Sequence, residues 1–137
     1  MVMRQEEIVN EIRRMCGEAI QMPFLGWHFM YNGQVYVYAT GRDDSMIRLN
    51  IPFVVGIKVQ DHERLSEAVN ATNRDVKYVK AMLLEKDRTR VSLDYDHKLS
   101  DDDSAKDIVP HIIKALDFAA RYLMNVLDNQ HGQQKGF

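Results

Sequence analysis

The dipeptide Asn32-Gly33 is the feature that most narrowly limits how this chain can fold. It separates two runs rich in aromatic and β-branched residues within the segment 24–40. Asn and Gly accept the positive φ angles that a two-residue type I′ turn requires, so the segment predicts an antiparallel β-hairpin. With these two residues in the turn, the register pairs three sets of residues: Tyr31 with Gln34, Phe29 with Tyr36, and Trp27 with Tyr38.

This register assigns every side chain of the hairpin to one face of the sheet, because directly opposed residues share a face. One face carries five aromatic residues: Trp27, Phe29, Tyr31, Tyr36 and Tyr38. The other carries a mostly aliphatic set suited to packing beneath helices: His28, Met30, Val35, Val37 and Ala39. Both faces are apolar, so helices on only one side would leave the other exposed. Three interpretations of the aromatic face stay open: the core, a dimer surface, or a groove for a partner.

Hydrophobic periodicity places further elements on both sides of the hairpin. Apolar residues at helical spacing predict a first helix over residues 4–20 and a last helix that follows Asp101–Asp103 and continues to Leu127. A middle helix capped by Asp61 ends near Asn73. It carries four residues on one face: Leu65, Ala68, Val69 and Thr72. Strands are predicted over 46–59, bent near Pro52, and over 76–85 and 89–97, joined by a turn at 86–88.

The predicted order is therefore α-β-β-β-α-β-β-α. Tight hairpins join antiparallel strands, so we expect an α+β fold in which helices pack on an antiparallel sheet. No repeat or linker divides the chain, and residues 1–128 are predicted to form a single domain. Residues 129–137 contain too few apolar side chains to offset the entropy of ordering, and we expect a flexible polar tail there.

Composition excludes several classes of protein. The 137 residues carry a net charge of −2, which argues against a nucleic-acid binder with a basic face. The first twenty residues hold no apolar block of the kind a signal peptide needs, and the longest apolar run, 51–57, is too short to cross a membrane. A single cysteine, Cys16, allows no intramolecular disulfide and favours a reducing compartment. We therefore expect a cytoplasmic protein with no nucleic acid or membrane partner.

Catalytic and metal-binding patterns are weak in this sequence. The phosphate-binding and nucleophile motifs built on glycine do not occur, and no two of the five histidines are spaced i, i+4. Asp94, Asp96 and His97 with Asp101–Asp103 suggest a hard-cation site, but they lack the offsets of a calcium loop. A cross-strand ion pair of Asp94 with Lys80 explains part of this cluster better. Cys16 lies on an apolar helical stripe, where burial should raise the pKa of its thiol. We expect no catalytic residue, metal or cofactor.

Two short segments carry a resemblance to a known family. Residues 49–56 read LNIPFVVG and lead into the middle helix, and residues 68–74 read AVNATNR and leave it with an N-x-x-N-R ending. In these segments and in its element order the chain resembles the YbjN family of bacterial sensory transduction regulators, over about residues 4–127. The resemblance implies the fold of type III secretion chaperones, a homodimer, and binding of protein rather than turnover of substrate. Asn70, Asn73 and Arg74 also fit a structural explanation, since Asn commonly caps a helix C-terminus.

We therefore expect a non-enzymatic, homodimeric domain, chaperone-like or regulatory, that binds a protein client through an apolar surface. The five aromatic residues of the hairpin are the candidate dimer or partner surface. The alternative is a sensory regulator that holds a small apolar ligand between the sheet and the last helix. The residues name neither the client nor the ligand, pathway or dimer geometry.

Overall fold

The computed structural model describes residues 5–41, 45–84 and 89–135, and these residues form three helices and a six-stranded sheet. The elements follow in chain order: α1 (Gln5–Cys16), β1 (Ala19–Met22), β2 (Gly26–Tyr31), β3 (Gln34–Ala39), β4 (Met46–Ile51), α2 (His62–Asp75), β5 (Lys80–Leu83), β6 (Val91–Lys98) and α3 (Ala105–Lys135). The sheet has the order β1-β2-β3-β4-β6-β5, and every neighbouring pair is antiparallel. The predicted α+β class is confirmed.

The β2–β3 hairpin has the predicted turn and register. Asn32 and Gly33 adopt φ angles of 47° and 81°, as a type I′ turn requires. Tyr31 pairs with Gln34, and the register continues without a bulge to Gly26 and Ala39. The local sequence therefore determined the faces of β2 and β3 correctly, although it could not determine which face the helices would cover.

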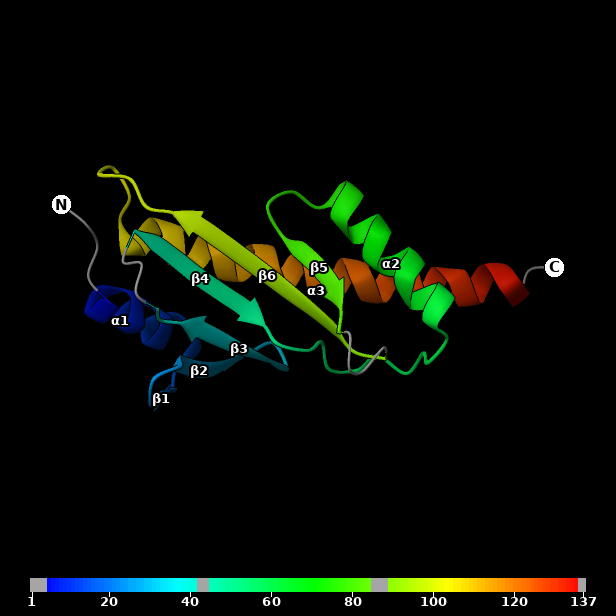
Figure 1. Ribbon diagram of the computed structural model, residues 1–137, viewed down its shortest axis with the longest axis horizontal. Helices are drawn as coiled ribbons and strands as arrows, with labels where there is room; N and C mark the ends of the chain where they lie inside the picture. Colours follow the sequence, from blue (N-terminus) through cyan, green and yellow to red (C-terminus); the bar gives the residue numbers. More distant parts are fainter. Residues whose placement is uncertain (1–4, 42–44, 85–88, 136–137) are drawn as a thin grey trace.

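The helices form a layer against one face of the sheet. Figure 1 shows α3 running behind β4 and β6, with α1 beside the first strands and α2 beside β5. Burial alternates along the central strands in agreement with this arrangement. In β4, for example, Ile47, Leu49 and Ile51 are fully buried while Arg48 is exposed. We call the covered side the inner face and the opposite side the outer face.

The first helix is shorter than predicted, and the difference is a strand. α1 ends at Cys16, and Gly17 has a φ of 91°, which turns the chain out of the helix. Ala19 and Ile20 then belong to β1, where Ala19 pairs with Phe29. Their apolar character continued the helical spacing, so periodicity alone assigned them to the helix.

The middle of the chain matches the prediction at the helix and differs at the strand before it. The side chain of Asp61 accepts a hydrogen bond from the backbone N–H of Glu63 at 3.0 Å, which is the predicted N-cap. The four residues predicted for the buried face of α2 are those buried: Leu65, Ala68, Val69 and Thr72. β4 ends at Ile51 rather than near Val59, because Pro52 cannot extend the hydrogen-bonded ladder. The predicted turn at 86–88 lies outside the described residues.

The last helix begins after Asp101–Asp103, as predicted, but ends later than predicted. It starts at Ala105, and Pro110 lies in its second turn. The helix continues to Lys135, so residues 129–135 are helical where a flexible tail was expected. Tertiary contacts explain the extension, because the Gln130 side chain donates to the backbone oxygen of Arg64 at 3.3 Å and to Glu67 at 3.2 Å. No helix in the described part of the chain is long and apolar enough to cross a membrane.

Candidate functional site

The five hairpin aromatics that were candidates for a binding surface lie on the inner face. Phe29 and Tyr36 are 1% and 0% exposed, their rings stack with centroids 5.3 Å apart, and Tyr38 is also buried. Trp27 and Tyr31 are half-buried and pack against the same core. Phe29, Tyr36 and Tyr38 are thus core residues of this chain, as in the first of the three interpretations. The pattern could not show this, because aromatic and aliphatic faces are both suited to burial beneath helices.

The outer face of β1, β2 and β3 is the apolar surface that the structure leaves open. Met30 is 53% exposed, and Ile20 on the adjacent β1 is also exposed. Around them lie half-exposed side chains with the same outward orientation: Met22, His28, Val35, Val37 and Ala39. The aliphatic set is also suited to packing beneath helices, but in the structure the aromatic face is the covered one. We call this area the outer apolar patch.

The outer face changes character at β4 and becomes polar towards β5. In the strand register Arg48 of β4 lies opposite Asp96 of β6, and Asp94 lies opposite Lys80, the position expected for it. Burial raises the pKa of Asp94, the negative charge of Asp96 raises it further, and Lys80 opposes both effects. Positive and negative charges thus alternate over this half of the face, next to an apolar half without Lys, Arg, Asp or Glu.

The residues that suggested a cation site are divided between the two sides of the sheet. Asp94 and Asp96 point outward, whereas His97 pairs with Ile47 on the inner face. The His97 Nε2 atom lies 2.9 Å from Asp103 Oδ2, and Asp103 also accepts a hydrogen bond from the Ser100 backbone at 2.8 Å. These contacts connect β6 to the segment that precedes α3. Within the described ranges, no group of three His, Cys, Asp or Glu side chains could hold a metal ion.

Cys16 lies at the end of α1, half-buried against the core. Burial raises the pKa of its thiol to about 11, in the predicted direction. A thiol with so high a pKa is almost entirely protonated at neutral pH, and only the thiolate is an effective nucleophile.

The motif at the end of α2 contains a contact that the sequence did not indicate. The Asn73 side-chain amide donates to the backbone oxygen of Ala81 at 2.9 Å and accepts from the Ala81 N–H at 2.7 Å. β5 is an edge strand, and Asn73 occupies backbone groups that a further strand would use. Asn73 therefore has a structural role, although the expected role was a helix cap.

Replacing Asn73 with Ala should lower the free energy of unfolding by about 1–2 kcal/mol, because both hydrogen bonds to β5 are lost. Asn70, an exposed residue of the same helix, provides the matched control. Asn70→Ala should leave stability unchanged or raise it slightly, since Ala favours helix. Urea denaturation of both variants measures the change in the free energy of unfolding. Equal changes for the two variants would rule out the contact of Asn73 with the edge strand.

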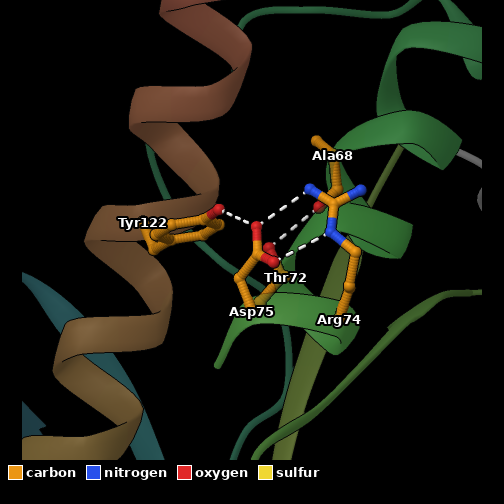
Figure 2. Close-up of polar contacts among 5 residues, drawn as sticks. All are labelled: Ala68, Thr72, Arg74, Asp75 and Tyr122. Atoms are coloured by element: carbon orange, nitrogen blue, oxygen red, sulfur yellow. Dashed lines mark hydrogen bonds and ion pairs between the residues drawn. The ribbon is translucent and has the colours of Figure 1, made fainter. Parts of the chain in front are cut away.

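Arg74 and Asp75, the next two residues, connect α2 to α3. The Arg74 guanidinium donates through Nε and Nη2 to the two carboxylate oxygens of Asp75, at 2.8 and 2.9 Å. The Tyr122 hydroxyl of α3 donates to the same carboxylate, as Figure 2 shows. The hydrogen bonds from Arg74 and then from Tyr122 lower the pKa of Asp75 from 3.8 to about 2. The Asp75 carboxylate in turn raises the pKa of Tyr122.

This arrangement predicts a pH dependence of stability that is confined to acid. The folded state lowers the pKa of Asp75, so its stabilisation is fully present above the unfolded value of 3.8 and is lost as the pH falls through about 2. The stability difference between the native chain and Asp75→Asn should be constant near neutrality and shrink across that window. Thermal unfolding followed by circular dichroism at a series of pH values measures it. A difference that stays constant down to pH 2 would contradict the assigned hydrogen bonds.

Comparisons with known proteins agree with this architecture. A crystal structure of an uncharacterised protein from Methanothermobacter thermautotrophicus superimposes with a TM-score of 0.64 at 18% identity, covering 92% of this chain and 97% of that one. The crystal structure of E. coli YbjN gives a TM-score of 0.63 at 10% identity, covering 95% and 96%. At such identities the likeness shows a shared fold. No curated protein matches the sequence.

The family assignment comes from the sequence itself. Residues 11–109 match the model of the YbjN family, described as "Putative bacterial sensory transduction regulator". That segment is well over half of the chain, so the chain belongs to the YbjN family. The predicted resemblance is confirmed, and the match includes both segments that carried it.

Proposed function

We propose that this chain is a non-enzymatic regulatory domain that binds protein and forms a homodimer through the outer apolar patch. The observation that carries the proposal is the uncovered apolar half of the sheet, with Ile20 and Met30 as its most exposed members. Contiguous exposed apolar surface on a soluble domain commonly marks a contact with another protein. Membership of a family of regulators supports a binding role over catalysis.

A second copy of the chain is the occupant that fits this surface best. A two-fold contact places the same patch of both chains together, and an apolar patch is complementary to itself. The neighbouring half of the face carries both signs of charge, from Arg48 and Lys98 to Asp94 and Asp96. Two copies related by a two-fold axis could therefore pair opposite charges around an apolar centre.

The patch can be tested by placing a charge in it. Met30→Arg should dissociate the dimer, because two copies would each bury a guanidinium without a partner. Phe118→Arg is the matched control, since Phe118 lies on α3 away from the sheet and is 52% exposed, against 53% for Met30. Light scattering on a sizing column gives the mass of each variant, and circular dichroism confirms that both fold. If Met30→Arg stayed dimeric, or if Phe118→Arg also dissociated, the interface would lie elsewhere.

A further inference from the structure

A second surface lies where α2 ends and β5 begins, at the opposite edge of the sheet from β1. Residues 73–80, except Asp75, line an open concavity of about 550 Å³. Val76 and Val79 point into the core, so the side chains between them face outward. Arg74, Lys77 and Lys80 give this concavity three exposed cationic groups. We call it the junction surface.

Tyr78 stands at the centre of this segment in an unfavourable conformation. Its φ of 70° lies in the left-handed region, which costs a bulky residue about 1 kcal/mol or more and which Gly would adopt freely. The side chain is nonetheless 75% exposed, with its ring centroid 6.2 Å from that of Tyr95. Most of this large aromatic group is therefore available for a contact outside the chain.

Arg74 is held in position before any partner arrives. Asp75 engages its Nε and Nη2 atoms, and Tyr122 holds Asp75 from α3. Figure 2 shows that the remaining terminal nitrogen of the guanidinium points away from Asp75. Fixing a long side chain in advance reduces the entropy lost on binding. Arg and Tyr are also the residue types most often found to dominate the energy of protein interfaces.

We propose that the junction surface binds an acidic, extended segment of a partner protein. Carboxylates of that segment would pair with Arg74, Lys77 and Lys80, and an adjacent side chain or backbone group would pack on the Tyr78 ring. The open shape suits an extended chain better than a small molecule, which usually needs an enclosing pocket. This inference goes beyond the proposed function, because it concerns a different edge of the sheet and requires no dimer.

The test uses the full chain labelled with ¹⁵N and follows amide resonances during titration with hexaglutamate. We expect concentration-dependent shifts centred on residues 74–80, which weaken as salt is added. Hexaglutamine, a neutral peptide of equal length, should produce none. Shifts spread over the whole surface, or no shifts with hexaglutamate, would overturn the proposal. Inorganic phosphate is the third ligand, and equal shifts at equal concentration would show a general anion site instead.

Two variants and one control separate the contributions of charge and of the Tyr78 ring to peptide binding. Lys77→Glu should weaken hexaglutamate binding at least about fivefold, because attraction becomes repulsion. Lys58→Glu makes the same change at an exposed position outside the junction surface and should leave binding unaltered. Gly readily adopts the backbone conformation of Tyr78, so Tyr78→Gly should fold normally. It should bind hexaglutamate more weakly. Unchanged binding by Tyr78→Gly would remove the ring from the proposal, and equal losses in both lysine variants would reduce it to net charge.

Discussion

Replacing Gly26 with Ala should remove most of the stability of the fold, by about 3 kcal/mol or more. Gly26 begins β2 with a φ of 137°, a conformation that residues with a side chain rarely adopt. A Cβ atom there would lie 2.0 Å from the backbone oxygen of Tyr38 and 3.0 Å from the backbone nitrogen of Thr40. Both are backbone atoms, the first in β3 and the second in the residue that follows its end, so only a backbone shift could relieve the overlap.

Gly33 and Gly17 separate the cost of the positive φ angle from the cost of the steric overlap. Their φ angles are 81° and 91°, but nothing lies within 4 Å of a Cβ added at either position. Ala at each should cost about 1 kcal/mol, which is the conformational penalty without an overlap. Urea denaturation of the three variants gives the comparison. Similar losses for all three would show that the close approach of Gly26 to β3 is absent.

A second large loss of stability is expected for a substitution on the inner face of the hairpin but not for one on the outer face. Phe29→Ala should cost about 3–5 kcal/mol, because it leaves a cavity beside the Tyr36 ring. Met30 is the next residue and points to the outer face, where its side chain is half-exposed. Met30→Ala should therefore cost less than about 1 kcal/mol in dilute solution.

Denaturation should be measured at low chain concentration, so that dimer formation does not contribute to the stability of either variant. Comparable losses for Phe29→Ala and Met30→Ala would mean that both faces are covered within one chain. The outer apolar patch would then be unavailable to a partner.

Local sequence signals determined the hairpin and the middle helix well. Asn32-Gly33 gave the turn and its register, and the Asp61 cap gave the start of α2. These features depend on residues close together in the chain. β1 was missed because Ala19 and Ile20 satisfy helical and strand spacing alike, and only pairing with β2 decides between them. The end of α3 was missed for a similar reason, since its ordering depends on contacts with α2.

The candidate sites were harder to predict, because they depend on contacts between distant segments. Two-sided apolar patterning predicted that one face of the hairpin would be left open, but it could not decide which face the helices cover. Asn73 was singled out by the motif, yet its contact with Ala81 exists only once α2 lies beside β5. Tyr122 is one of several residues on a long amphipathic helix, and nothing near it in the sequence indicates its bond to Asp75.

The mass of the unmodified chain in solution decides whether the outer apolar patch forms a dimer. Light scattering on a sizing column, over a range of concentrations, separates one chain of 15.9 kDa from a dimer of about 32 kDa. We expect the dimer, with dissociation only on dilution, because the proposed two-fold contact would cover the outer apolar patch of both chains. A mass of one chain at every concentration would contradict this expectation and would leave the patch without its proposed occupant.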